Sequence, residues 1–544
     1  MNNETAFQPA DYIPTDTVHK QHYFFRFGHT NDLNSLILGS QTNNDVATDY
    51  ILGVTSASMI ILGVALLWSL VIMIFKCAGQ KRVGFLAGRL ENPKWQPSLP
   101  PIEECLTEDD DNFSTQTPIG HQHNASSGPE NFSVAVTATG SDRKFDRKAK
   151  MVRVIFVISG LCVMIAGALF YAKGVTAFQN SLNDVHNSLG IVENTALESR
   201  NLTLSVLLAK QNLQSNLHET ISETGAEFCQ RSGQVADEIR EAGKQLVSDV
   251  NEISSGVDEA LKSLSTDLLT VADTARGMNR YLQTASGFFY TLIAVSIVIF
   301  VLICLMSAVT VFSANDVSNC FTKCVTCALI WPLFIFFLTL SWIFASLFLI
   351  FSLAGSDFCY KPDEIVLTLI NQNKDKIDSV IFAMLIFYVS GCAVTPPAMD
   401  DITKLIAMVK TMIAHATDLA EEIASQDVNN LESLCGLDDA GATALQNFAQ
   451  LIPGIAENID KALGSFKGII SCQNINPIYT SLVHDATCTE AVDGFTWLFG
   501  SCFALCICAM IMITFRAALY PVKRPELDST SGLSAPLLSS KNGP

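Results

Sequence analysis

Six cysteines offer the clearest chemistry in this sequence of 544 residues. They lie outside the long apolar runs, in two polar segments, at Cys229, Cys359, Cys392, Cys435, Cys472 and Cys488. An even number of cysteines in such segments is typical of proteins that form disulfides in an oxidising compartment. The sequence therefore predicts a disulfide-locked domain, although spacing alone leaves all fifteen pairings open.

No other set of residues points to catalysis. The sequence has no phosphate-binding glycine loop, no H-E-x-x-H and no G-x-S-x-G motif. The nine histidines are scattered, and His484 is interpreted as structural. Four further cysteines lie at the ends of apolar runs, at Cys77, Cys320, Cys324 and Cys327. They lack the other ligands of a zinc site, so they are inert thiols or palmitoylation sites. We expect no enzyme activity, no metal site and no cofactor.

Five apolar runs are long enough to cross a membrane, for which about 20 residues suffice. They cover residues 51–75, 154–172, 287–312, 325–353 and 494–515, and none contains Asp, Glu, Lys, Arg or His. This segregation explains how a positive mean hydropathy coexists with a net charge of −19. The first run begins too late for a cleaved signal peptide. The sequence predicts five transmembrane helices.

Basic residues near the ends of the runs predict the orientation. Clusters within 76–89 and 143–153 place the loop 76–153 in the cytosol, and its composition predicts that it is largely disordered. The other segments follow: 1–50, 173–286 and 354–493 outside, and the hairpin 313–324 and the tail 516–544 inside. This is the plan of a multi-pass plasma-membrane protein.

N-glycosylation sequons give mixed evidence on this orientation. Asn112, Asn124 and Asn131 begin N-x-Ser sequons inside the loop that we place in the cytosol. Chance sequons are frequent in Asn- and Ser-rich sequence, so the basic clusters carry more weight. We expect glycosylation at Asn3 and Asn201, on the outer side.

The N-terminal segment is polar and shows no periodicity, which indicates a partly ordered outer segment. It carries four closely spaced aromatic residues: Tyr23, Phe24, Phe25 and Phe27. Aromatic residues are favoured at the membrane interface, which gives a second interpretation of these four.

The predicted outer loops carry helical patterns. In 173–286, apolar residues step by threes and fours through Leu246, Val250, Ile253, Val257, Leu261, Leu264, Leu268 and Val271. This predicts a helix that packs within its own domain or, alternatively, a self-associating coiled coil, with a break near 224–225 or 232–233. Further helices are expected in 402–425 and 442–466. The predicted fold is an all-α membrane protein, with five transmembrane helices and a disulfide-locked helical extracellular domain built from two loops.

The most specific motif is D-F-C-x-x-P-D at residues 357–363, directly after the fourth run. Later come F-Y-V-S-G-C ending at Cys392, S-C at Cys472 and a Tyr479…Cys488-x-E…Gly494 stretch entering the fifth run. With the five-run plan and the tight hairpin, these motifs resemble the tweety family of membrane proteins. The resemblance is good from the third run to the fifth and absent from residues 77–150 and from the tail. Prominins share the five-run plan but have far larger outer loops.

The resemblance implies two nested disulfides, Cys359–Cys488 and Cys392–Cys472. Cys229 and Cys435 then remain as a third pair that would tie the two outer loops together. The chain also departs from the family, because it has no Arg-Gly-Asp motif. In addition, residues 173–178 read K-G-V-T-A-F where the family has an acidic, Asn-containing stretch. The resemblance thus implies possible calcium regulation, but this departure leaves its ligands unassigned.

Two functions remain. The resemblance implies a chloride or other anion channel of the calcium- or volume-regulated type, whose path basic residues would line. The candidates near the outer mouth are Lys173, Arg276, Arg280 and Lys361. Interface anchoring explains these residues better than an anion path does. In addition, the spans carry no charge, and the acidic outer loop disfavours anion entry. The alternative is a lipid-binding, non-conducting, dimeric membrane scaffold or adhesion protein. The expected partners are membrane lipids, anions and a second copy of the chain, with no nucleic acid.

Overall fold

The computed structural model describes residues 12–42, 44–78, 80–87, 140–225, 228–314, 326–377, 379–393 and 397–519. Helices dominate these residues, and no β-strand occurs among them. The predicted all-α class is therefore confirmed for this part of the chain. Asn3, residues 88–139, residues 315–325 (most of the hairpin and the first residue of the fourth run) and residues 520–544 lie outside the described residues. What the sequence predicts for them stays a prediction.

Four helices are long and apolar enough to cross a membrane: Asp45–Ala78, Arg147–Thr224, Ala328–Tyr360 and Asp439–Thr514. They contain all or nearly all of the first, second, fourth and fifth predicted runs. The third run lies in α7 (Gln234–Ala314), where the structure describes the shorter apolar stretch Ile297–Thr310. The helices indicate a membrane protein, and the count of five spans stays a prediction.

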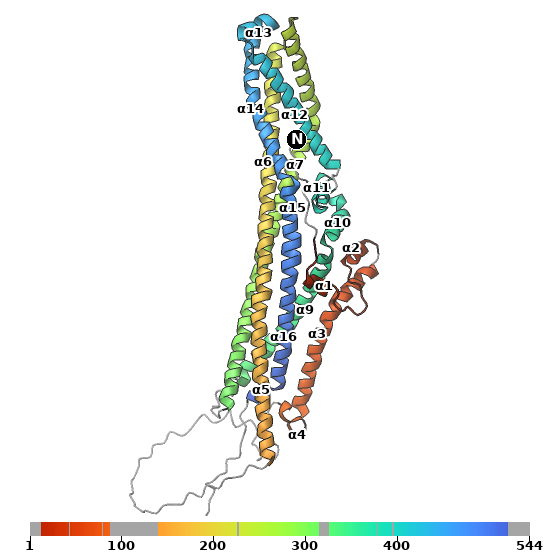
Figure 1. Cartoon of the computed structure of the whole chain (residues 1–544), viewed down its shortest axis with the longest axis vertical. Coiled ribbons are helices and arrows are strands. Elements are labelled where there is room, and N and C mark those ends of the chain that lie inside the picture. Colours follow the sequence, from red (N-terminus) through yellow and green to blue (C-terminus); the bar gives the residue numbers. More distant parts are fainter. Residues whose placement is uncertain are drawn as a thin grey trace, which may run out of the picture. The chain divides into compact units, whose positions relative to one another are not determined.

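The chain divides into two compact units, each of which is considered by itself. Unit 1 comprises Met1–Ile60, Leu169–Ala294 and Phe344–Ser501, and unit 2 comprises Ile61–Ala168, Val295–Ile343 and Cys502–Pro544. Figure 1 labels the helices of both units along the chain.

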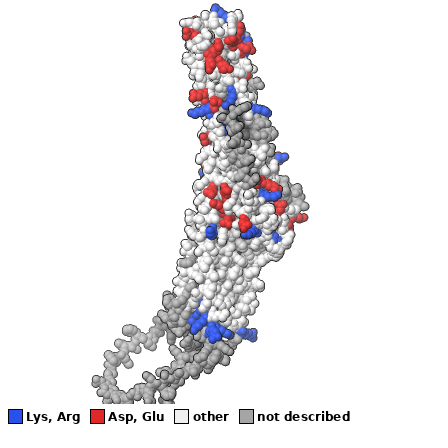
Figure 2. Space-filling model, viewed as in Figure 1, with Lys and Arg blue, Asp and Glu red and all other residues white. Residues whose placement is uncertain are grey.

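Unit 2 consists of parts of long helices and a few short ones. These are α3 (Asn44–Ala78), α4 (Gln80–Val83), η1 (Gly84–Ala87), α5 (Gly140–Leu169), α7, η4 (Thr326–Ile330), α9 (Trp331–Tyr360), α16 (Val492–Thr514) and η7 (Arg516–Leu519). Its core is apolar, with Phe156, Ile303 and Phe334 among the fully buried side chains. Figure 2 shows Lys and Arg side chains gathered beside an uncharged face. Described basic residues near the helix ends include Lys76, Arg82, Arg147, Lys148, Lys150, Arg153 and Arg516.

Unit 1 contains the remaining helices and the polar ends of the long ones. The additional helices are α1 (Asp16–His22), α2 (Leu33–Thr42), η3 (Phe170–Val175), α6 (Thr176–Thr224), α10 (Pro362–Gln372), η5 (Lys374–Lys376), α11 (Ser379–Val389), α12 (Pro397–Ala424), α13 (Val428–Cys435), α14 (Asp439–Ile469), α15 (Cys472–Thr480) and η6 (Ser481–Ala491). Helix α14 packs against α6 and α12. Leu246, Val250 and Leu261 of the predicted apolar series are buried in this core. That face of α7 therefore packs within its own unit.

A disulfide lies within this core. Cys229, just before α7, pairs with Cys435 at the end of α13, with a Cα–Cα distance of 4.1 Å. Both cysteines are fully buried. The backbone N–H of Gln230 donates to the carbonyl oxygen of Cys435 at 2.7 Å. The bridge and this hydrogen bond join the two segments that the sequence predicts to be outer loops.

Close packing beside this bridge makes glycine necessary at one position of α7. A Cβ atom at Gly243 would lie within 2.9 Å of Phe228 Cε2, and the Phe228 side chain is fully buried. Gly277, on the same helix, has no neighbour within 4 Å of an added Cβ. The two glycines therefore form a matched pair in which only one position is crowded.

We predict opposite effects for Gly243→Ala and Gly277→Ala. Alanine is favoured over glycine inside a helix by about 1 kcal/mol, so Gly277→Ala raises the stability of unit 1. Overpacking costs about 1–3 kcal/mol, so Gly243→Ala lowers that stability despite the same helix propensity gain. The midpoint of thermal unfolding in detergent measures both. Equal shifts for the two variants would contradict the packing of Phe228 on α7.

Candidate functional site

The site begins with a carboxylate at an unfavourable place. Asp357 lies in the last turn of α9, where the helix dipole disfavours negative charge. Its side chain is buried, and burying an ionised carboxylate is costly unless charged and hydrogen-bonding partners compensate it. The first residue of the D-F-C-x-x-P-D motif therefore needs cationic and donor groups around it.

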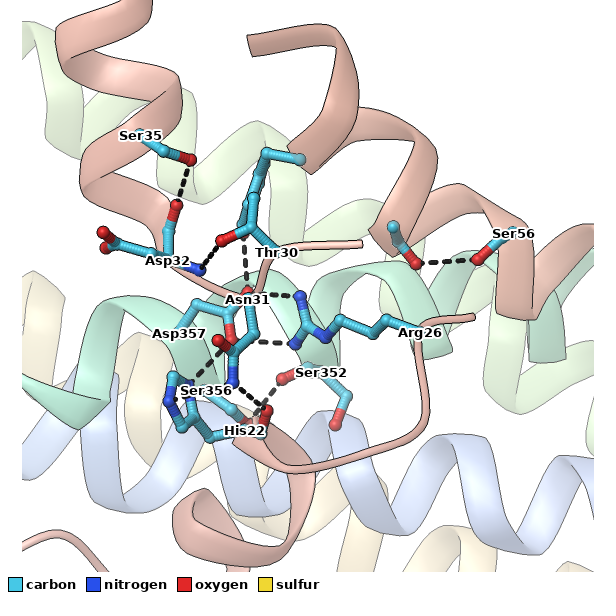
Figure 3. Close-up of polar contacts among 12 residues, drawn as sticks. His22, Arg26, Thr30, Asn31, Asp32, Ser35, Ser56, Ser352, Ser356 and Asp357 are labelled. Atoms are coloured by element: carbon cyan, nitrogen blue, oxygen red, sulfur yellow. Dashed lines mark hydrogen bonds and ion pairs between the residues drawn. The ribbon is translucent and has the colours of Figure 1, made fainter. Parts of the chain in front are cut away.

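Residues from the N-terminal segment and from α3 supply those partners (Figure 3). The guanidinium of Arg26 donates to both oxygens of Asp357, Nη1 to Oδ2 and Nη2 to Oδ1, each at 2.8 Å. Tyr50 Oη donates to Oδ2 at 2.8 Å, and His22 Nδ1 lies 3.0 Å from Oδ1. We call Asp357, Arg26, Tyr50 and His22 the carboxylate clamp.

Asn31 determines which nitrogen of His22 carries the proton. Its Nδ2 donates to the carbonyl oxygen of His22 at 3.0 Å and lies 3.2 Å from His22 Nε2. A carbonyl oxygen can only accept, so this nitrogen is the donor, and Nε2 accepts from it. Nδ1 then carries the proton and donates to Asp357. The ring also stacks on Tyr360, with centroids 4.0 Å apart and planes 6° from parallel.

The clamp leaves no room for catalysis at Asp357. An ionised carboxylate offers about four acceptor sites, and two donors from Arg26 and one each from Tyr50 and His22 use them. The Asp357 oxygens therefore have no lone pair left to accept a substrate proton or to bind a metal ion. The clamp therefore works as a link between segments far apart in the chain.

A disulfide lies two residues further along the motif. Cys359 pairs with Cys488 of η6, with a Cα–Cα distance of 5.2 Å. Val18 of α1 and Val492 pack against this bridge, and all four side chains are buried. The first turn of α1 is capped by Thr15, whose side chain accepts from the backbone N–H of Val18. Helix α1 thus covers the bridge from one side.

The end of the motif makes a second polar cluster. Pro362 begins α10, a position that favours proline, and Asp363 follows in the first turn. Asp363 Oδ1 accepts from Tyr479 Oη at 2.5 Å and lies 2.8 Å from His484 Nε2. Desolvation, the largest single effect, raises the pKa of Asp363, but hydrogen bonds from His484 and Tyr479 outweigh it. They hold that pKa below its usual range.

The third disulfide belongs to a neighbouring part of unit 1. Cys392, after α11, pairs with Cys472 at the start of α15, with a Cα–Cα distance of 6.3 Å. Tyr388 strengthens this connection, because its hydroxyl donates to the carbonyl oxygen of Ile470 at 2.6 Å. The Asn476 amide donates in turn to the Tyr388 carbonyl oxygen at 3.0 Å. In the structure, the six cysteines named from the sequence thus form the three pairs expected above.

The four basic residues proposed for an anion path lie on three elements, η3, α7 and the start of α10. Arg276 pairs with Glu193 at 2.7 Å, and Lys361 pairs with Glu364 at 2.9 Å. Lys173 is exposed on η3 and Arg280 is exposed on α7. The glycosylation candidate Asn201 is exposed on α6.

No protein-family model matches the chain, and no curated protein is similar enough to count as a relative. In the described ranges, no group of three or more His, Cys, Asp or Glu residues could hold a metal ion. The tweety resemblance therefore rests on the motifs quoted above and stays a hypothesis.

Sequence reasoning singled out Asp357 and Cys359 but missed Arg26, His22 and Tyr50. These partners lie between 307 and 335 residues away from Asp357 in the chain. One signal was present, because an acidic residue that follows an apolar run needs a cationic partner if it is buried. The single arginine in the N-terminal segment, Arg26, was the candidate to test.

We predict that breaking the clamp on one side destabilises the N-terminal segment strongly. Arg26→Met leaves Asp357 buried without its counter-charge, which costs about 3–5 kcal/mol. In the double variant Arg26→Met/Asp357→Leu, much of this loss is recovered, because neither charge remains to be desolvated. Limited proteolysis of residues 12–31 and the thermal midpoint measure the effect.

The matched control is Lys20→Met. Lys20 pairs with Asp16 at 2.7 Å, but both side chains are largely exposed, so this pair contributes little. We expect no change in either measurement. If Arg26→Met behaved like Lys20→Met, the clamp would not hold the segment.

We also predict an acid-labile contact at Asp363. A carboxyl whose pKa is lower in the folded state adds stability above its unfolded pKa, and this stability is lost as the pH falls through the folded pKa. The unfolded value is about 4, so the contact of α10 with Tyr479 and His484 weakens below about pH 4. Hydrogen exchange of α10 amides between pH 6 and pH 3 follows this loss.

Two variants separate Asp363 from its exposed neighbour. In Asp363→Asn, the acid-dependent part of the exchange disappears because no carboxylate remains to be protonated. Glu364→Gln removes a carboxylate that pairs with exposed Lys361 and keeps the acid dependence. The reverse pattern would show that the acid lability comes from another group.

Proposed function

We propose that this chain is a non-enzymatic, five-span plasma-membrane protein of tweety-like plan that acts as a lipid-binding, non-conducting scaffold. Residues 1–50, 173–286 and 354–493 lie outside in this proposal, and the loop 76–153 and the tail lie in the cytosol. One observation carries the proposal. Hydroxyl groups of the apolar helices donate their hydrogen bonds to carbonyl oxygens of their own helices.

Hydroxyls in the apolar part of unit 2 bond within their own helices. Thr310 donates to the carbonyl oxygen of Met306 at 2.8 Å, and Ser341 donates to that of Phe337 at 2.8 Å. Thr514 donates to the Met510 carbonyl oxygen at 2.9 Å and accepts from Trp68 Nε1 at 3.3 Å. An ion path needs polar groups directed toward a common lumen. These hydroxyls all donate within their own helices, and the side chains between the helices are apolar.

Apolar side chains along α3 support lipid contact. The most exposed include Met59, Leu66, Leu67, Met73 and Ile74, each more than half exposed. Single exposed apolar residues are ordinary, but a long row of them on one helix requires a covering. Lipid acyl chains provide that covering for a helix of this length. The basic residues at the helix ends suit anionic headgroups on the cytosolic side.

Anion conduction remains as a second candidate because of two cations. Lys173 and Arg280 are exposed, and no ion pair engages either within the described ranges. Lys173 also lies on the π-helical segment η3, a type of segment that is frequent at functional sites. If the protein conducts anions, these two residues are the first candidates to attract the anion.

Chloride flux into vesicles distinguishes the two candidates. For the purified full chain in phosphatidylcholine liposomes, we expect chloride flux equal to that of empty vesicles. We also expect phospholipid to stay bound to the protein after extensive detergent washing, because the apolar helix faces retain it. Flux is measured with a chloride-sensitive dye and bound lipid by phosphate analysis.

The variant Lys173→Gln/Arg280→Gln makes the test specific. If the wild-type chain conducts and this variant loses most of the flux, the protein is a channel and the scaffold proposal fails. Lys361→Gln is the matched control, because it also removes one exposed cation, but one that is already paired with Glu364.

A further inference from the structure

A loop next to the carboxylate clamp exposes an unusual number of aromatic rings. Residues 23–28, here called the aromatic loop, contain Tyr23, Phe24, Phe25 and Phe27 around a single arginine. Tyr23 is 63% exposed, Phe25 65% and Phe27 51%. Such a concentration of exposed rings marks an interaction surface.

The loop has a defined conformation. Its one charged side chain, Arg26, is buried in the clamp with Asp357. The rings of Phe25 and Phe27 pack edge to face with centroids 4.4 Å apart, and Tyr23 Oη lies 3.1 Å from Tyr360 Oη. Phe27 adopts a positive φ of 52°, which is uncommon for a large side chain. The backbone is therefore held in a form that turns the charge inward and leaves the rings exposed.

Contacts with α3 fix the height of this loop along a membrane-crossing helix. An added Cβ at Gly53 would lie 2.9 Å from His29 Cβ and 3.8 Å from Arg26 Cδ. Four residues earlier, Asp49 Oδ2 accepts from the backbone N–H of Thr30 at 3.0 Å. These contacts span about 6 Å of helix at 1.5 Å per residue. They bracket residue 51, where the first apolar run begins.

The clamp gives the same height from α9. Asp357 lies four residues after residue 353, where the fourth apolar run ends. Both helices thus place the loop at the boundary between an apolar run and a polar segment. Aromatic residues are enriched at that depth, because their rings are favoured between headgroups and acyl chains.

We propose that the aromatic loop inserts into the interface of the lipid leaflet on the N-terminal side of the membrane and anchors α3 there. Ile51 and Leu52, adjacent to Gly53, are about half exposed and belong to the apolar run, so the lipid-facing surface of α3 continues up to the loop. The occupant is phospholipid, not a second copy of the chain. The inference rests on the proposed function in one respect, because both require that α3 inserts in a bilayer. It does not require lipid retention or the absence of conduction.

Photo-crosslinking in the full chain tests this insertion. p-Benzoylphenylalanine replaces Phe25 or Phe27 in separate variants, and each protein is reconstituted into liposomes that contain radiolabelled phosphatidylcholine. Both positions are exposed and aromatic, so the substitutions preserve the fold. After irradiation, radiolabel attached to the protein measures lipid contact.

Leu208 is the matched control position. It is exposed on α6 and lies 32 residues after the start of that helix at Thr176, which is about 48 Å along its axis. We expect lipid adducts at positions 25 and 27 to exceed those at position 208 by about tenfold, the ratio that burial of one aromatic side chain supports.

Three outcomes are informative. Lipid adducts at positions 25 and 27 support the proposal. Adducts with a second copy of the chain, seen as a doubled mass on denaturing gels, overturn it and assign the loop to a protein interface. Adduct yields equal to that at position 208 also overturn it, because the rings then face water. Phospholipid retained by the same preparation is measured separately, so failure of the loop proposal is distinguishable from failure of the scaffold proposal.

Discussion

The ion pair between Arg26 and Asp357 is the interaction on which the organisation of unit 1 depends. A carboxylate cannot stay ionised and buried at the end of a helix without a counter-charge, and Arg26 supplies it with two hydrogen bonds. Because Tyr50 of α3 and His22 of α1 join the same carboxylate, three distant segments meet at one point. The N-terminal segment is therefore an integral part of unit 1 and does more than precede α3 in the chain.

Three positions of the D-F-C-x-x-P-D motif have separate physical roles around this pair. Asp357 belongs to the clamp and Cys359 pairs with Cys488 of η6, while Asp363 lies in the first turn of α10, where the helix dipole favours its charge. The three links respond to different conditions. Reduction breaks the disulfide, acid weakens the Asp363 contact, and loss of either charge breaks the clamp. Seven consecutive residues thus connect α9 to the N-terminal segment, to η6 and to α10.

The sequence predicted what depends on local pattern and missed what depends on distant partners. Apolar runs of sufficient length predicted the helices that could cross a membrane, and the break near 224–225 appears where Gly225 ends α6 with φ +82°. Leu246 and Val250 turned out to be buried as their spacing suggested. By contrast, nothing local in Arg26 or Tyr50 indicates a partner more than 300 residues away. The cysteine pairs were expected only because the motifs resemble a family, since six cysteines alone allow many pairings.

The clamp also explains how α3 and α9 could keep a fixed register without polar residues in most of their length. In a membrane, apolar helices gain little from burying their faces against one another, so packing and hydrogen bonds decide their alignment. Within unit 1, Tyr50 meets Asp357, and Ser58 donates to the carbonyl oxygen of Ser346 at 3.0 Å. The two contacts run in opposite directions along the chain, as an antiparallel pair requires. A slip of one helix turn would move Tyr50 about 5 Å from its acceptor and expose Asp357 to an apolar surface. The polar end of the pair therefore fixes the alignment of the apolar part.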